Sequence, residues 1–182
     1  MRKTLLVLIC CLVLSGCSVL NNEKVEKDSI QKYETYLTSL IEQDRFLEGS
    51  YYFSISAVFN KLDDGQVRYD VFIEDAQVAM YSIEILVIEN TAKRTDTTIY
   101  PCVGIFENED YTMVPFQKNE SQGFVEGFQL TGVSSNEKPV LNILVTWKDY
   151  AKLNTYREFI KLIPKETVNE ETTVPDIIEH GE

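Results

Sequence analysis

Histidine is nearly absent from this sequence, since the only one is His180, close to the last residue. Nucleophilic catalysis of the Ser/His/Asp or Cys/His type needs a histidine held beside the nucleophile, and many zinc sites combine cysteine with histidine. A glycine-rich phosphate loop is missing as well. We therefore expect a protein without enzymatic activity and without a metal or another cofactor. Carboxylate chemistry stays open as an alternative, because acidic residues are abundant.

Basic residues are also scarce, with 17 Lys and Arg against 29 Asp and Glu, which gives a formal net charge of −12. Binding to nucleic acid requires clustered Lys and Arg that neutralise phosphates, so we expect no nucleic-acid partner. Flat docking on an anionic lipid surface is disfavoured for the same reason. The simplest interpretation of the acidity is that it keeps an extracellular protein soluble.

One segment carries a specific signal, namely the N-terminal residues that end at Cys17. Two basic residues at the start precede an apolar run over residues 5–14. This run is too short for a transmembrane helix, which needs roughly 20 apolar residues, but it suits a signal peptide. The motif Leu14-Ser15-Gly16-Cys17 resembles the lipobox of bacterial lipoproteins. The resemblance implies that residues 1–16 are removed and that lipid is attached to Cys17.

Lipid on Cys17 defines where the protein is expected to work. Each buried CH₂ group contributes about 0.8 kcal/mol, so two or three acyl chains give lasting attachment. The resemblance therefore implies a protein anchored by lipid on the extracytoplasmic side of a cell membrane, in a host with one membrane or two, with the membrane as one partner through Cys17. Cys10 and Cys11 leave with the signal peptide, so only Cys102 remains and no internal disulfide is possible. We expect Cys102 to be a buried, unreactive thiol, because no basic neighbour lowers its pKa.

Residues 17–28 are largely polar and are expected to form the lipidated N-terminus and a linker. The segment that follows has apolar residues at helical spacing, and Asp28 is suitable as its N-cap. These apolar residues are Ile30, Tyr33, Leu37, Leu40 and Ile41. Gly49 then ends the pattern. The spacing predicts one amphipathic helix over residues 29–48.

From residue 49 onward the apolar period changes from helical to alternating. Two alternating runs flank Asp63-Asp64-Gly65, which is a strong signal for a β-hairpin. Further strands are expected within residues 80–88, 99–106, 111–116, 124–130, 140–147 and 155–163. Trp147 shares one strand face with Leu141, Ile143 and Val145, and that face has no charged member. We therefore expect Trp147 in the core between two sheets.

Short strands without a second helix favour antiparallel connections. The expected fold is mainly β, an antiparallel β-sandwich of Ig-like architecture with seven to eight strands over residues 49–164, preceded by the single helix. The Cys…Trp…Cys pattern of true immunoglobulin domains is missing. "Ig-like" is thus an expectation about architecture and implies no family. Residues 165–182 are rich in Glu and Thr, and we expect them to form a disordered acidic tail.

Aromatic residues are the candidates for binding, since the sequence has ten Tyr and nine Phe. The alternating pattern assigns most of them to the core. Tyr52, Tyr100 and Tyr111 are candidates for an exposed aromatic face that contacts protein or glycan. The acidic turns at 63–65 and 107–110 could ligate calcium through loop oxygens. Neither turn has EF-hand spacing, and a hairpin explains the first.

The main functional hypothesis is a lipid-anchored, extracytoplasmic binding or assembly module that is not catalytic. Its partner would be a protein or another component of the cell envelope. The alternative is an extracytoplasmic carboxylate-dependent hydrolase, or a regulator of a cell-envelope enzyme. A deep pocket with two convergent acids would favour the alternative, and an exposed aromatic patch would favour the binding module. Capture of a small solute ranks last, because the chain is too short for a two-lobed solute-binding protein.

Overall fold

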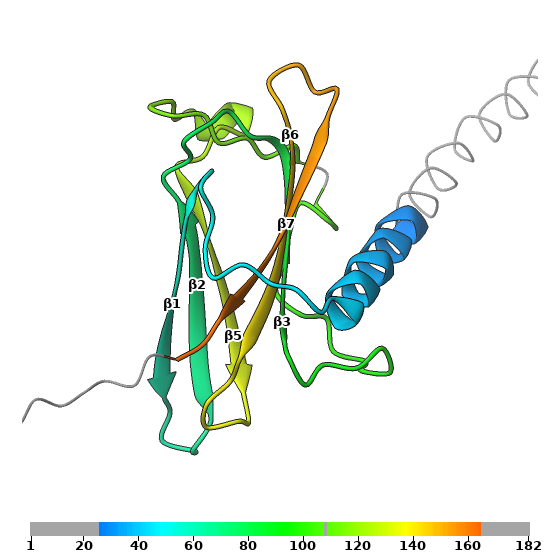
Figure 1. Cartoon of the computed structure of the whole chain (residues 1–182), viewed down its shortest axis with the longest axis vertical. Helices are drawn as coiled ribbons and strands as arrows, with labels where there is room; N and C mark the ends of the chain where they lie inside the picture. Colours follow the sequence, from blue (N-terminus) through cyan, green and yellow to red (C-terminus); the bar gives the residue numbers. More distant parts are fainter. Residues whose placement is uncertain (1–25, 108, 165–182) are drawn as a thin grey trace, which may run out of the picture.

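Two antiparallel β-sheets form the body of the protein in the computed structural model, which describes residues 26–107 and 109–164 (Figure 1). The three-stranded sheet has the order β1-β2-β5, from Ser54–Lys61, Val67–Glu74 and Gly127–Ser134. The four-stranded sheet has the order β4-β3-β6-β7, from Cys102–Val103, Tyr81–Glu89, Leu141–Lys148 and Thr155–Leu162. The prediction of a mainly β, antiparallel fold with one helix is confirmed, and the two sheets are consistent with a β-sandwich.

The first hairpin forms where the alternating pattern predicts it. β1 pairs with β2 from Ser54 opposite Glu74 to Lys61 opposite Val67. Gly65 has a φ of 84°, which a glycine adopts without the steric cost of a side chain. The amide of Gln66 donates to the carboxylate of Asp64 at 3.0 Å, which fixes the turn. The acidic turn at 63–65 therefore has a structural role in closing the hairpin.

The core lies between the two sheets and is built from the inward residues of each strand. Tyr69, Val71 and Ile73 alternate inward on β2, as period-two patterning requires. Trp147 is 2% exposed and packs edge-on against Phe53, with ring centroids 5.8 Å apart. The prediction that Trp147 lies in the core is confirmed. β6 is buried on both faces except at its last residue, so a second layer covers its outer side.

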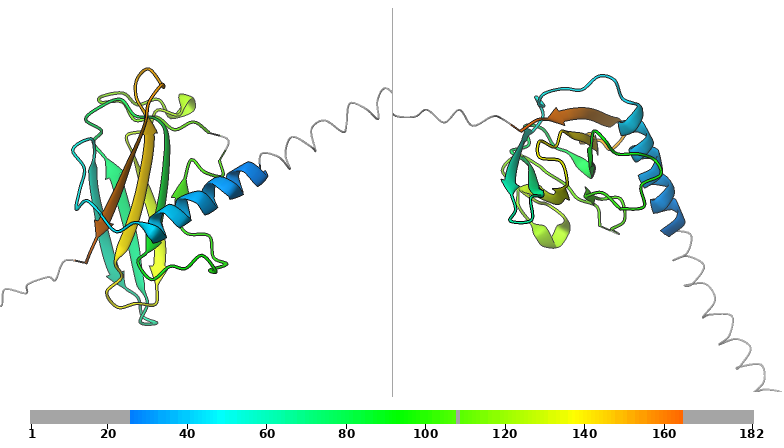
Figure 2. Two further views of the ribbon diagram at one scale, coloured as in Figure 1. Left: turned by 45° about the vertical axis from the view of Figure 1, so that its right-hand side comes forward. Right: turned by 90° about the horizontal axis from the view of Figure 1, so that it is seen from below.

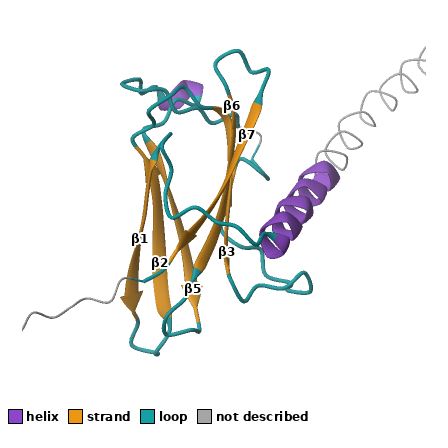
Figure 3. Cartoon of the chain, in the orientation of Figure 1, coloured by secondary structure: helices purple, strands orange, loops and turns teal. Residues whose placement is uncertain are grey.

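That second layer is the N-terminal helix, residues 26–42 (Figures 2 and 3). Its buried side chains Tyr33, Leu37 and Leu40 form one cluster with outward residues of the four-stranded sheet. Those sheet residues are Leu86, Ile88 and Leu144. Lys32 binds Glu84 of β3 at 2.6 Å, and the hydroxyl of Tyr36 donates to the same carboxylate. Among the described residues no helix is long and apolar enough to cross a membrane.

The helix ends at residue 42, earlier than the predicted boundary at 48, and it already includes residues 26–28, which were expected in the linker. The early end follows from strand pairing, because Leu47 forms a parallel bridge with Ile160 of β7. The amide of Leu47 donates to the carbonyl of Phe159 at 2.8 Å, and the amide of Lys161 donates back at 2.9 Å. Residues 43–50 thus run along the edge of the four-stranded sheet. The predicted signal peptide, lipidation site and acidic tail lie outside the described residues.

Two other segments differ from the sequence-based boundaries. The strand expected over 99–106 is reduced to β4, because Pro101 has no amide to donate and Gly104 then turns the chain with a φ of 73°. A Cβ at Gly104 would lie 2.2 Å from the carbonyl of Ile83, so glycine is needed there. The strand expected over 111–116 is present only as isolated bridges, such as Met80 with Met113.

β5 begins three residues later than expected and continues to Ser134, because β2 pairs along its whole length with β5. Gly132 of β5 gives room to a core side chain. A Cβ on Gly132 would lie 2.2 Å from the hydroxyl of Tyr69. The glycine is explained by the close approach of this tyrosine ring.

Candidate interaction surface at the loop end

Antiparallel connectivity gathers three connections at one end of the molecule. They join β2 to β3 (75–80), β4 to β5 (104–126) and β6 to β7 (149–154), and the segment leading into β1 (50–53) lies beside them (Figure 1). We call this the loop end. Its segments are anchored to one another, because the amide of Gln77 donates to the carbonyl of Tyr52 at 2.7 Å. Met80 and Met113 also exchange two backbone hydrogen bonds, at 2.8 and 2.9 Å.

Exposed apolar side chains are concentrated at the loop end. Half of the large hydrophobic side chains that are exposed in the described residues lie there. They are Tyr51, Tyr52, Val78, Phe106, Phe116, Tyr150 and Leu153, and Tyr156 lies beside Tyr52 near the start of β7. Phe116 is fully exposed, and Tyr51, Tyr150 and Leu153 are 97%, 81% and 84% exposed. Exposed aromatic side chains grouped in this way mark interaction surfaces more often than scattered ones do.

Part of this surface is an aromatic group that closes the edge of the sandwich. The ring of Tyr156 stacks on Trp147 with a centroid distance of 5.6 Å and an interplanar angle of 14°. Tyr52 packs against Trp147 at 5.4 Å and against Tyr156 at 6.4 Å. Tyr156 stacked and Tyr52 tilted therefore both pack against the buried tryptophan, and they remain 41% and 37% exposed to solvent.

The three tyrosines selected from the sequence lie in different surroundings. Tyr52 belongs to the loop end. Tyr111 also belongs to the β4–β5 connection, but it is half-buried and packs edge-on against Phe128 at 5.6 Å. Tyr100 is half-buried in the cluster beneath the helix, on the opposite face of the four-stranded sheet. Its hydroxyl donates to Asp96 at 2.7 Å, and burial together with this carboxylate raises the pKa of Tyr100.

Several exposed residues of the loop end are not among those selected from the sequence, notably Phe116, Tyr150 and Leu153. A signal for the last two is present in the chain. Residues 149–154 connect two alternating strands, and such a hairpin connection lies outside the sheet and cannot direct a large apolar side chain into the core. Asp149 accepts hydrogen bonds from the amides of Leu153 and Asn154, which orders this connection. No comparable pattern distinguishes Phe116.

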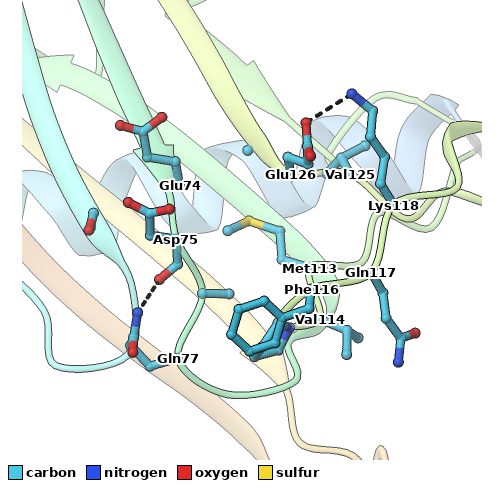
Figure 4. Close-up of a pocket in the computed structure, with 14 residues that line it drawn as sticks. Glu74, Asp75, Gln77, Met113, Val114, Phe116, Gln117, Lys118, Val125 and Glu126 are labelled. Atoms are coloured by element: carbon cyan, nitrogen blue, oxygen red, sulfur yellow. Dashed lines mark hydrogen bonds and ion pairs between the residues drawn. The ribbon is translucent and has the colours of Figure 1, made fainter.

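A groove of about 870 Å³ opens at the loop end (Figure 4). One wall is the turn after β2, with Glu74, Asp75 and Gln77, and another is formed by residues 113–118. Residues 125–127 complete the lining. The floor is apolar, since the half-buried Ala76 and Val125 line it and pack against the core, to which Met113 belongs. We call this feature the acidic groove.

The charges of the acidic groove are unevenly balanced. Glu74, Asp75 and Glu126 contribute three exposed carboxylates, and Lys118 contributes one ammonium group. Lys118 binds Glu126 at 2.9 Å and Glu120 at 3.4 Å, and the hydrogen bond with Glu126 raises the pKa of the lysine. Within the part of the chain that the structure describes, the carboxylates of Glu74 and Asp75 have no cationic partner.

Two side chains of the acidic groove stand on left-handed backbone. Asp75 has a φ of 53° and Phe116 a φ of 62°, a region that non-glycine residues seldom adopt. Such conformations persist only where surrounding contacts hold them. At Asp75 the amide side chain of Gln77 donates to the backbone carbonyl at 2.7 Å. The turn that carries Asp75 is thereby held at the mouth of the groove.

Asp70, a buried acid of β2 outside the loop end, has structural partners. The Asp70 carboxylate accepts from Thr131 at 2.6 Å, from Gln129 at 3.2 Å and from Arg68 at 3.0 Å. Burial raises the pKa of the Cys102 thiol to about 11, so the thiol stays protonated and is a poor nucleophile at neutral pH. No group of three or more His, Cys, Asp and Glu side chains in residues 26–107 and 109–164 is arranged to hold a metal ion.

No protein-family model matches this chain, and no curated protein or solved structure is significantly similar to it.

Proposed function

We propose that this protein is a lipid-anchored, extracytoplasmic binding module that is not catalytic, and that the loop end is its interaction surface. The observation that carries the proposal is the concentration of exposed aromatic and aliphatic side chains at that end. Tyrosine in particular gives large contact area at low conformational cost, which is why binding loops on sandwich domains are rich in it. A partner that covers these side chains would remove their apolar surface from water.

The arrangement of strands supports an Ig-like interpretation of the sandwich. In immunoglobulin-type domains the first, second and fifth strands share one sheet, and the third, sixth and seventh share the other. β1, β2 and β5 share one sheet here, and β3, β6 and β7 share the other. β4 differs from the constant-type order, because it pairs with β3 instead of the three-stranded sheet. On this interpretation, two of the three connections at the loop end correspond to those that carry antigen-binding loops in variable domains.

The lipobox-like motif at Cys17 supports the anchor part of the proposal. Residues 18–25 span at most about 28 Å when fully extended, so a lipidated Cys17 would keep the helix near the membrane. The net negative charge of the chain would repel an anionic membrane surface. A tethered domain held off the bilayer is suited to present a surface to a neighbouring protein.

The hydrolase alternative is less well supported by the acidic groove. A carboxylate-dependent hydrolase needs one carboxyl group that its surroundings keep protonated at working pH. The three acids of the groove are exposed, and Glu126 is already bound to Lys118. This geometry favours a binding role for the groove.

The proposal is tested with Tyr150→Ser/Leu153→Ser, which removes two exposed apolar side chains from the β6–β7 connection and leaves the acidic groove intact. The lipidated full-length protein is extracted from its membrane with mild detergent, and its particle size is measured by native electrophoresis. We expect the unaltered protein in a complex larger than the monomer and the double variant as the monomer.

The matched control is Ile99→Ser/Val133→Ser, which removes two exposed apolar side chains away from the loop end. This control should leave the complex intact. If the unaltered protein is monomeric under these conditions, or if both variants lose the complex to the same extent, the loop end is not the interaction surface.

A further inference from the structure

The acidic groove has two properties that rarely occur together on a solvent-exposed surface. Its rim carries the uncompensated carboxylates of Glu74 and Asp75, and its floor is the apolar edge of the core at Met113, Ala76 and Val125. A ligand of negative charge would be repelled by the rim. A purely polar cation would leave the apolar floor in contact with water.

Phe116 adds a third element of recognition. Its ring is fully exposed on the wall formed by residues 113–118, and the carboxylates of Glu74 and Asp75 lie on another wall (Figure 4). An exposed aromatic face attracts the ammonium group of lysine and the guanidinium group of arginine. The apolar stem of either side chain also contacts hydrophobic surface while its charged head stays hydrated. The groove thus offers carboxylates, an aromatic face and an apolar floor to one type of side chain.

The groove is large and open enough to hold a chain segment. A volume of about 870 Å³ lies near the upper end of the range for small-molecule sites, which is roughly 300–1,000 Å³. Its charged lining side chains are exposed, so a bound segment can enter and leave along the surface. The walls are held by the Met80–Met113 backbone pair and by the hydrogen bond from Gln77 to Tyr52, which reduces the ordering cost of binding.

We propose that the acidic groove binds a basic, amphipathic segment of a partner protein, in which lysine or arginine alternates with apolar residues. The cationic heads contact Glu74, Asp75 and Glu126, and the apolar residues contact the groove floor and Phe116. Charge complementarity favours this occupant, because the groove carries three acids and one lysine that is already paired. This inference rests on the proposed function, because it names the kind of partner that the binding module recognises.

The test uses full-length lipidated protein in a nonionic detergent and three fluorescein-labelled probe peptides of equal length. They are (Arg-Leu)₃, the charge-reversed (Glu-Leu)₃ and the polar (Arg-Ser)₃, and binding is measured by fluorescence polarisation. We expect (Arg-Leu)₃ to bind at least about tenfold more tightly than either of the others. Raising the salt concentration should weaken that binding, because the contacts are solvent-exposed.

The carboxylates are tested with Glu74→Gln/Asp75→Asn/Glu126→Gln. Asparagine tolerates the left-handed backbone at Asp75, so the turn is retained. The matched control is Glu34→Gln/Asp44→Asn/Glu48→Gln, which removes the same charge from exposed positions near the helix. The groove variant should bind (Arg-Leu)₃ at least about tenfold more weakly than the control does.

The aromatic contact is tested with Phe116→Asn, which also suits left-handed backbone, against Ile99→Asn as the exposed control. The fluorescence spectrum of Trp147 verifies that each variant is folded.

An equal loss of affinity for (Arg-Leu)₃ in the groove charge variant and in its control would mean that the overall negative charge of the protein attracts the peptide. That result would overturn the proposal. Equal binding of (Glu-Leu)₃, or no binding of (Arg-Leu)₃ at about millimolar concentration, would overturn it as well. If the protein binds none of the three peptides but still forms the complex that depends on Tyr150 and Leu153, the inference about the acidic groove is overturned. The proposed function of the loop end then still stands.

Discussion

Trp147 is a core side chain that packs directly against Tyr52 of the loop end. It is 2% exposed, with Phe53 edge-on from the interior and Tyr156 stacked on its outer side. A buried tryptophan contributes a large apolar area, and its aromatic neighbours add a smaller geometric term. The tryptophan therefore supports both the sandwich and the exposed tyrosines that cover it.

Trp147→Ala should lower the free energy of unfolding by about 3–5 kcal/mol, because it leaves a cavity between the sheets. This is a large part of the roughly 5–15 kcal/mol that stabilises a typical domain. Chemical denaturation of the variant and of Tyr150→Ala, an exposed position on the neighbouring connection, measures the difference. In the unaltered protein, the emission of this only tryptophan should be blue-shifted and shielded from iodide. A variant with ordinary stability, or a red-shifted and iodide-quenched emission, would contradict the core position.

Asp70 has a different role, because it is a nearly buried acid on the outer face of the three-stranded sheet. The hydrogen bond from Thr131, and then those from Arg68 and Gln129, lower the pKa of its carboxyl group. Since the pKa in the folded protein is below that of an unfolded aspartate, about 3.9, the carboxylate stabilises the fold above about pH 4. That contribution is lost as the pH falls through the lowered pKa.

Asp70→Asn should therefore lower the free energy of unfolding by about 1–3 kcal/mol at neutral pH, because donors that faced a carboxylate lose a good acceptor. The difference from the unaltered protein should shrink as the pH falls below about 4. Urea denaturation at about pH 7 and about pH 3 measures both values. An equal difference at the two pH values would show that the charge of Asp70 does not contribute.

At the scale of whole elements, the helix and the strands differ in how well the sequence predicts them. The alternating residues of β1 and β2 and the Asp-Gly turn between them encode the first hairpin locally, and the structure has it. The end of the helix is decided by a partner far along the chain, because Leu47 pairs with Ile160. Local periodicity holds no information about such a pairing. For the same reason, the sequence identifies the apolar face of the helix and not the sheet that it covers.

In the candidate surface, too, the sequence predicts what is encoded locally and does not predict what depends on distant parts of the chain. That Tyr150 and Leu153 lie outside the core can be derived from their place between two strands. The acidic groove cannot be derived in this way, because it joins Glu74 and Asp75 with residues 113–118 across a long stretch of chain. The sequence makes Tyr100 a candidate for an exposed aromatic face, but Tyr100 packs beneath the helix, which comes from another part of the chain.

The edge strand β7 carries an unusual inward acid. Glu158 pairs with Val145 on the face that looks toward the other sheet, between Tyr156 and Ile160. One of its carboxylate oxygens is buried without a hydrogen-bond partner among the described residues. Inward charged residues on edge strands discourage the pairing of sheets from different molecules. This placement suits a domain whose contacts are made through its loops.

The attachment of the helix is tested with Leu40→Ala. Leu40 is fully buried against the four-stranded sheet, so the variant should lose about 2–5 kcal/mol of stability. Hydrogen exchange of the amides in residues 30–42 should accelerate at the same time, because the helix loses its main apolar contact. Ile30→Ala, at a position that is 45% exposed, is the control and should change little. Unchanged exchange in Leu40→Ala would show that the helix is not held by this cluster.

At the scale of the whole molecule, the helix links the proposed anchor to the sandwich. It follows Cys17 within a few residues of chain and is fixed to β3 by Lys32 and Tyr36 through Glu84. Burial, followed by the hydrogen bond to Glu84, raises the pKa of Tyr36 to about 12, so its hydroxyl stays protonated as the donor at physiological pH. A rigid attachment of this kind limits the directions in which the loop end can face relative to a membrane.

Cys17→Ala tests the anchor on which this arrangement depends. By resemblance to bacterial lipoproteins, the peptidase acts only when a cysteine can carry lipid, so the variant should be released from the membrane or keep residues 1–16. Detergent-phase partitioning shows whether the variant is still attached to the membrane. Mass spectrometry of the N-terminal peptide shows whether residues 1–16 are still present. The unaltered protein should begin at Cys17 and carry the mass of two or three acyl chains, which bind lastingly because each buried CH₂ adds about 0.8 kcal/mol.

Cys102→Ala, which removes the other cysteine expected in the mature chain, should partition as the unaltered protein does. A Cys17→Ala protein that lacks residues 1–16 and still enters the detergent phase would exclude the lipid on Cys17 as the anchor.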